Sequence, residues 1–140
     1  MRKRLKILII ILCVASCLSA CYAHRKQEYY SQKDNYVTAT GTLTYISYDE
    51  DGTGIYLSFS ELTPRFNDNC FKIVGENYEI AQENGLNEKL EEGKRIDFVS
   101  APRYFGDGYI MPIVAISVDG EVLLDFEEGY NNWLEWIEKS

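Results

Sequence analysis

The residues that could bind a ligand are concentrated in one aromatic segment, residues 102–109. An arginine and three aromatic side chains surround a Gly-Asp-Gly turn there: Arg103, Tyr104, Phe105 and Tyr109. Exposed aromatic rings stack on a sugar or a peptide, and an arginine pairs with a carboxylate. The segment is therefore a candidate binding loop. The same rings also suit cross-strand pairs that hold a hairpin together, which is the alternative interpretation.

Recognisable catalytic and metal-binding motifs are missing from the sequence. It contains no GxSxG, HExxH, P-loop, dinucleotide-binding or paired CxxC motif. Asp49 and Asp51 are similar to the start of a Ca²⁺ loop, but Ser60 stands where the EF-hand pattern needs a carboxylate. The neighbouring acids Glu91-Glu92 point to different sides of a regular element and make a poor acid–base pair. We therefore predict no enzyme, no catalytic residue, no metal and no cofactor.

The N-terminus has the pattern of a secretory signal peptide. Residues 1–20 hold four bases and no acid, and residues 7–20 form an uncharged stretch of 14 residues. This stretch is too short for a stable membrane-spanning helix, which needs roughly 20 residues. A basic start followed by a short apolar stretch is typical of a signal peptide. We therefore assign residues 1–20 to a signal peptide.

Residues 18–21 extend this assignment, because they read Leu-Ser-Ala-Cys. That sequence resembles the lipobox of bacterial lipoproteins, in which the Cys thiol receives a diacylglyceryl group before cleavage. The resemblance implies that Cys21 is lipidated and becomes the first residue of the mature chain. The protein is then expected at the cell membrane, lipid-anchored on the extracytoplasmic side. The alternative is an ordinary secreted protein with a chance cysteine.

Cysteine usage agrees with a lipoprotein. Cys13 and Cys17 lie in the signal peptide, so Cys70 is the only thiol left when Cys21 carries lipid. An exported disulfide framework normally has an even number of cysteines. We therefore expect no disulfide within the chain and a buried or half-buried thiol at Cys70. In the secreted alternative, Cys21 and Cys70 could pair.

Residues 21–36 are expected to be the lipidated cysteine and a polar tether that holds the folded part away from the bilayer. The segment is charged and has no hydrophobic period. Its three bases could favour anionic headgroups, each worth about 1 kcal/mol close to the surface. These bases are Arg25, Lys26 and Lys33. The only histidine, His24, also lies in this segment, and we expect no function for it.

The overall charge excludes one class of partner. The chain has 140 residues and a net charge of −8, and residues 21–140 carry 10 bases against 22 acids. Apolar residues make up 46% and charged residues 26%, which is typical of a globular domain. Nucleic-acid binding requires a positive surface. We therefore predict no nucleic-acid partner.

Alternation and turn residues predict a mainly β domain over residues 37–124. Strands are expected at 37–45, 55–60, 71–74, 94–100 and 109–118, with a short addition at 121–124. A short helix is expected over 76–83, where Asn84-Gly85 would end it. Residues 125–140 have apolar side chains at helical spacing: Phe126, Tyr130, Trp133, Leu134 and Ile137. They predict an amphipathic helix that packs on the domain, or alternatively docks a partner.

The order of three strands, a helix and two strands is similar to the OB-fold, a small five-stranded Greek-key barrel. The chain also resembles small bacterial lipoproteins with an OB-fold-like domain, which implies no catalytic residue. A β-sandwich or another small barrel is the alternative. OB-folds bind ligands on strands two and three, between two loops that correspond here to residues 47–54 and 102–109. Tyr48 and Tyr56 therefore join the candidate ligand-binding residues.

These features together predict a membrane-anchored binding or adaptor module for an envelope protein, peptide or glycan. The alternative is an envelope enzyme, either a hydrolase or a metal-dependent enzyme, whose site has no recognisable motif. Catalysis needs a pocket in which titratable groups converge with perturbed pKa values. An aromatic surface without such a pocket favours binding.

Overall fold

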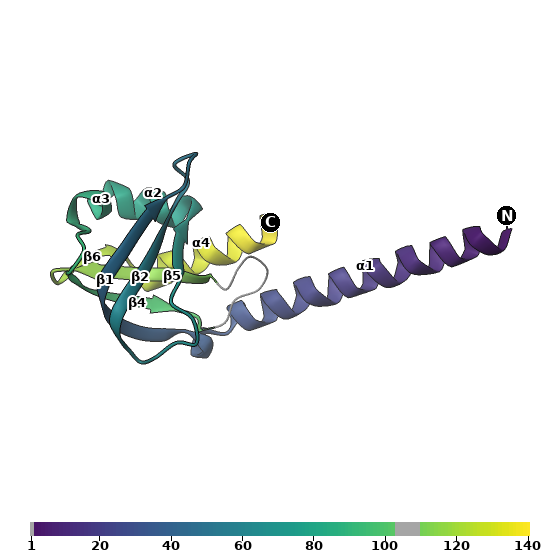
Figure 1. Ribbon diagram of the computed structural model, residues 1–140, viewed down its shortest axis with the longest axis horizontal. Helices are drawn as coiled ribbons and strands as arrows, with labels where there is room; N and C mark the ends of the chain where they lie inside the picture. Colours follow the sequence, from purple (N-terminus) through teal and green to yellow (C-terminus); the bar gives the residue numbers. More distant parts are fainter. Residues whose placement is uncertain (1, 103–109) are drawn as a thin grey trace.

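The computed structural model describes residues 2–102 and 110–140, which form a β domain with a long N-terminal helix leading away from it (Figure 1). In chain order the elements are α1 (Arg2–Ser31), the 3-10 turn η1 (Lys33–Asn35), β1 (Val37–Tyr48), β2 (Gly54–Thr63), β3 (Phe71–Val74), α2 (Gly75–Glu83), α3 (Leu86–Lys89), β4 (Arg95–Ser100), β5 (Met111–Val118), β6 (Glu121–Leu124) and α4 (Phe126–Lys139). The strand and helix positions follow the hydrophobic pattern of the sequence closely.

Five of these strands close a barrel. Neighbours pair in the order β3-β2-β1-β4-β5, and a short parallel pairing of β3 with β5 closes the ring. The other pairs in the ring are antiparallel. Because α2 and α3 connect β3 to β4, this is the OB-like Greek-key barrel that the sequence predicts. β6 extends the sheet beyond the ring by pairing with the far end of β5.

The barrel interior is filled by apolar side chains that alternate along the strands. Phe59 from β2 stacks on Phe98 from β4, with ring centroids 4.7 Å apart. Phe71 from β3 meets both rings edge-on. All three rings are buried, and each contributes roughly 1.5–3 kcal/mol by leaving water. The same alternation directs the intervening side chains of β2 and β3 to the outer face of the barrel.

A β-bulge changes which side chains of β1 face inward. The alternation predicts Tyr45 on the same side as the buried Leu43, but Tyr45 is 55% exposed. The register of β1 against β2 shifts between these two residues. A bulge adds one residue to a strand and moves the side chains that follow to the other face. The prediction for Tyr45 was therefore wrong, and Ile46 packs against the core instead.

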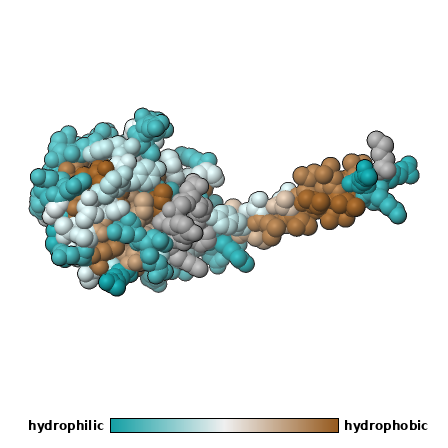
Figure 2. Space-filling view, viewed as in Figure 1, coloured by the Kyte–Doolittle hydropathy of each residue, from teal (hydrophilic) through white to brown (hydrophobic). Residues whose placement is uncertain are grey.

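Helix α1 begins in the predicted signal peptide and continues past Cys21 to Ser31. Its first part carries exposed apolar side chains, which form a hydrophobic band that leads away from the barrel (Figure 2). Its length and composition would allow it to cross a membrane, and a signal sequence near the N-terminus has the same properties. The assignment of residues 1–20 to a signal peptide thus stays a prediction.

The second part of α1 lies in the predicted tether, whose role at the bilayer stays a prediction, and its end is docked on the barrel domain. Residues 21–31 are helical, and the end of the segment packs against α4. Tyr30 is 2% exposed, and its ring meets the Trp133 ring edge-on at 5.2 Å. Tyr36 donates a hydrogen bond from its hydroxyl to the backbone carbonyl of Tyr30. Residues 21–36 have no hydrophobic period that could reveal this docking. The apolar contacts of Tyr30 are made with α4, about 100 residues later in the chain, and not with residues of its own segment.

Helix α4 packs along the barrel wall, as its apolar stripe predicts. Trp133 and Ile137 are at most 5% exposed and pack together with Val114 of β5. Gly129 brings the helix close to this strand. A methyl group on Gly129 would lie 1.7 Å from the carbonyl oxygen of Val114. The position therefore has room for a glycine only.

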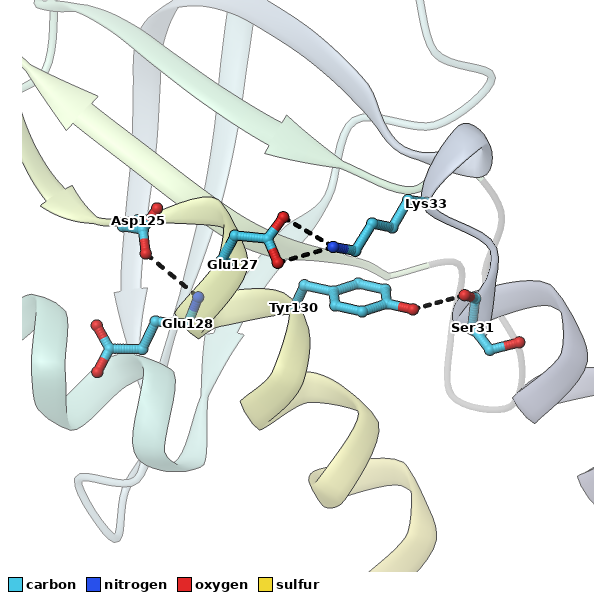
Figure 3. Close-up of polar contacts among 6 residues, drawn as sticks. All are labelled: Ser31, Lys33, Asp125, Glu127, Glu128 and Tyr130. Atoms are coloured by element: carbon cyan, nitrogen blue, oxygen red, sulfur yellow. Dashed lines mark hydrogen bonds and ion pairs between the residues drawn. The ribbon is translucent and has the colours of Figure 1, made fainter.

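Polar contacts complete the docking between α4 and the segment after Cys21 (Figure 3). The Tyr130 hydroxyl donates a hydrogen bond to the backbone carbonyl of Ser31. The Lys33 ammonium pairs with the Glu127 carboxylate at 2.7 Å. Both side chains of the ion pair are exposed, so the pair contributes less than about 1 kcal/mol. Aromatic contacts therefore dominate this interface. Tyr30 makes them with Trp133, and Tyr36 makes them with Phe126 and Tyr130.

Asp125 caps the start of α4. Its carboxylate accepts a hydrogen bond from the backbone N–H of Glu128 at 3.3 Å (Figure 3). We expect Asp125→Ala to lower the free energy of unfolding by about 1 kcal/mol, the usual effect of a lost N-cap. Asp125→Asn keeps an acceptor and should change it much less. Denaturant unfolding followed by circular dichroism measures both variants, and equal losses would contradict the capping role.

Candidate functional site

Two polar side chains stand together on the outer face of the barrel, Tyr56 on β2 and Lys72 on β3. Each lies between buried neighbours and therefore points away from the core. The two residues are direct partners in the antiparallel pairing of β2 with β3. Such partners have Cβ atoms about 4.5–5.5 Å apart. They mark the face on which OB-folds bind ligands.

A hollow of about 270 Å³ lies over this face. It is bordered by the loop between β1 and β2, by the last turns of α4 and by the part of α1 that follows Cys21. Its lining includes the polar and aromatic side chains of Lys26, Asp49, Thr53, Tyr56, Lys72 and Trp136. The volume is near the lower end of small-molecule sites, roughly 300–1,000 Å³. It suits a small ligand or one unit of a larger one.

The Asp49 carboxylate forms the loop side of the hollow. It lies beside the Tyr56 hydroxyl, close enough to act on it electrostatically. Burial raises the pKa of Tyr56, and the negative charge of Asp49 raises it further. Tyr56 therefore stays protonated at neutral pH and can donate a hydrogen bond. A methyl group on Gly54 would lie 2.9 Å from the Asp49 carboxylate, so the glycine leaves room for the acid.

Two tryptophans form the opposite wall. The Lys72 ammonium lies 5.5 Å from the centroid of the Trp133 ring, within the range of a cation–π contact. Trp133 is 4% exposed, and its indole N–H has no hydrogen-bond partner among residues 2–102 and 110–140. Trp136 is 39% exposed and rests on Gly75, where a methyl group would lie 2.5 Å from the ring. Trp136 therefore offers a ring that a ligand can reach.

The structure brings one of the predicted ligand-binding residues into this hollow. Tyr56 lines it, whereas Tyr48 is 50% exposed at the end of β1 and is not part of its lining. The candidates of the aromatic loop lie outside the described residues: Arg103, Tyr104, Phe105 and Tyr109. Cys21 is an exposed free thiol on α1, where lipidation would be sterically accessible. Cys70 is half-buried, as predicted, and burial raises the pKa of its thiol.

Sequence reasoning missed Lys72 and Trp136, and it assigned Lys26 to the bilayer surface and not to the barrel. Lys72 had a usable signal, because it alternates with the apolar residues of β3 on the strand that carries the OB ligand face. Trp136 stands outside the apolar stripe of α4, which distinguishes it from the packed Trp133. Lys26 had no signal that pointed to the barrel, since only the docking of α1 brings it to the hollow.

A larger hollow of about 420 Å³ lies between α1 and α4. His24, Gln27 and Glu28 line one side, and Leu134 and Ile137 line the other. Among the described residues, no tryptophan, tyrosine or lysine lines it. Its chemistry is that of a crevice between two helices, so the smaller hollow over β2 and β3 is the stronger candidate site.

The loop between β1 and β2 forms a hydrogen-bonded turn. Asp51 accepts hydrogen bonds from the hydroxyl and the backbone N–H of Thr53. These bonds lower the pKa of the Asp51 carboxyl. Within the described part of the chain, no three His, Cys, Asp or Glu side chains come close enough to hold a metal ion. Because Thr53 lines the hollow, its hydrogen bonds to Asp51 help to fix the rim.

Comparisons with known proteins return no match: no protein-family model matches the chain, and neither do curated proteins or solved structures. The site is therefore interpreted from its own residues and from its place on the barrel.

Proposed function

We propose that this protein is a lipid-anchored binding module of the bacterial envelope, with its ligand site in the hollow on the outer face of β2 and β3. Cys21 supplies the anchor in this proposal and places the barrel on the extracytoplasmic side of the membrane. The ligand is an envelope protein, peptide or glycan. The Leu-Ser-Ala-Cys segment and the basic, apolar N-terminus support the anchor.

One observation carries the binding role: a reachable ring, two cations and a carboxylate meet in one hollow on the face that OB-folds use. The Trp136 ring can stack on a sugar or a peptide side chain. Lys26 and Lys72 can pair with an anionic group, and Asp49 can accept hydrogen bonds from ligand donors. These are the groups that orient a bound ligand.

The same geometry favours binding over catalysis. Catalytic sites bring together titratable groups whose pKa values are shifted toward the working pH. Here the pKa of Tyr56 is raised, which moves it further from neutrality. The Asp49 carboxylate beside it contributes to this rise. This pair can position a ligand but is poorly suited to act as a base or a nucleophile at neutral pH.

The test is in-cell crosslinking of the full lipoprotein, followed by mass spectrometry of the captured molecules. We expect the Tyr56→Ala/Trp136→Ala variant to capture at least about tenfold less partner than the parent protein, since a few aromatic residues often supply most of the binding energy. Tyr48→Ala is the matched control, because Tyr48 is exposed on the same barrel but lies outside the lining of the hollow. Circular dichroism verifies that each variant is folded.

A partner captured equally by the hollow variant and by Tyr48→Ala would contradict the proposed site. Capture that persists in a Cys21→Ala chain, at the same membrane location as the parent protein, would contradict the proposed anchor. The two parts of the proposal can therefore fail separately.

A further inference from the structure

The distance along α1 between Cys21 and the hollow limits how far the hollow can lie from the membrane. Lys26, which lines the hollow, is five residues after Cys21 on an uninterrupted helix. At 1.5 Å per residue, the two positions are about 7.5 Å apart along the helix axis. The acyl chains on a lipidated Cys21 enter the hydrocarbon core. The headgroup layer of each leaflet is roughly 5–8 Å thick, the difference between the full bilayer and its core.

Helix α1 cannot easily swing the hollow away from that layer. Tyr30 is buried against Trp133, and the Tyr130 hydroxyl holds the carbonyl of Ser31. The C-terminal end of α4 lies beside α1 and points toward the N-terminal side of the molecule (Figure 1). Trp136 and Lys72 line the same small hollow as Lys26 and therefore lie near it in height. With Cys21 in the membrane, the hollow meets the headgroups first.

The chemistry of the hollow narrows the ligand further. Residues 21–140 carry far more acids than bases, yet Lys26 and Lys72 line the same small space. Two ammonium groups match a phosphate. The negative charge of Asp49 would repel an anion that has no hydrogen-bond donors. Its carboxylate oxygens can, however, accept hydrogen bonds from the hydroxyls of a ligand. Thr53 lies on the same rim, and Trp136 offers a ring face for an apolar sugar or polyol face.

We propose that the hollow takes the headgroup of an anionic membrane lipid in which a phosphate is joined to a sugar or another polyol. The phosphate pairs with Lys26 and Lys72, the hydroxyls bind Asp49 and Thr53, and the ring or carbon chain lies against Trp136. This inference rests on the proposed function and narrows its glycan to one carried by a lipid. Occupancy of the hollow then depends on the lipid composition of the membrane in which the protein is anchored.

Intrinsic fluorescence provides a direct readout, because the two tryptophans of the chain both line the hollow. The full lipoprotein is placed in nanodiscs of phosphatidylcholine, of phosphatidylcholine with phosphatidylserine, and of phosphatidylcholine with phosphatidylinositol. We expect the emission maximum to shift with phosphatidylinositol and much less with the other two compositions. Phosphatidylserine is the control for charge, because its headgroup is anionic but contains no polyol. Titration of the phosphatidylcholine sample with glycerophosphoinositol or inorganic phosphate separates a headgroup from a free phosphate.

Lys26→Gln/Lys72→Gln is the decisive variant, with Lys89→Gln/Lys94→Gln as the control for equal loss of charge. Lys89 and Lys94 pair with Glu121 and Asp119 and do not line the hollow. We expect the hollow variant to bind glycerophosphoinositol at least about tenfold more weakly than the control. Identical spectra in all three compositions, or equal weakening in both variants, would overturn the headgroup assignment. If crosslinking still captures a partner through Tyr56 and Trp136 in that case, the proposed function stands without it.

Discussion

Gly129→Ala is expected to lower the free energy of unfolding by about 3 kcal/mol, at the upper end of the usual range for overpacked sites. Helix propensity alone predicts the opposite sign, because alanine is better than glycine inside a helix by about 0.5–1 kcal/mol. The tertiary contact decides the outcome. The added methyl would lie 1.7 Å from the carbonyl oxygen of Val114, which belongs to the backbone of β5 and cannot rotate away.

Denaturant unfolding of the full chain in detergent, followed by far-ultraviolet circular dichroism, measures this effect. Glu128→Ala is the matched control, since Glu128 is the exposed neighbour on the same helix and only its backbone N–H takes part in the cap. We expect Glu128→Ala to change the free energy of unfolding by less than about 0.5 kcal/mol. A Gly129→Ala protein as stable as the control would show that α4 does not lie against β5 as closely as described.

Tyr30→Ala is expected to release residues 21–30 from α4 while the barrel stays closed. Tyr30 is 2% exposed, and truncating a buried aromatic side chain costs about 3 kcal/mol. That loss reduces the ratio of docked to undocked molecules by roughly two orders of magnitude. The barrel core contains none of these contacts, because its stacked phenylalanines form a separate cluster.

Hydrogen exchange of the backbone amides of residues 22–31 reports the release, and tryptic cleavage after Arg25 and Lys26 is an independent check. Tyr22→Ala is the control, since it makes the same chemical change on an exposed part of α1. We expect faster exchange in residues 22–31 of Tyr30→Ala alone, with barrel amides unchanged. Unaltered protection would contradict the docking, and loss of protection in the barrel would show that the two clusters unfold together.

The strands and helices of the barrel could be predicted from the sequence because each carries its own periodicity. The alternation around Phe59 and the apolar stripe that includes Trp133 are local properties, so a short window of sequence suffices. The orientation of Tyr45 could not be predicted in this way. Its side chain faces outward because of a bulge between β1 and β2, and the register of two strands is a property of their pairing.

The candidate site was harder to predict because its parts come from distant segments. Tyr56 could be placed on the ligand face from the OB-like strand order. Lys72 and Trp136 join it only through the pairing of β2 with β3 and the packing of α4. Lys26 joins it only when Tyr30 docks on Trp133. Such contacts depend on the whole fold and leave no periodic signal in any one segment.

The sequence by itself determined the strand and helix pattern and the excess of acids, because both are properties of neighbouring residues. Neighbouring residues also carry the prediction of a signal peptide and a lipidated Cys21. The tertiary structure alone decided that the segment after Cys21 is a docked helix and that a lysine from it lines a hollow on the barrel. The physical reason is that Tyr30 is buried against Trp133, and these two side chains are far apart in the chain and meet only in the folded structure.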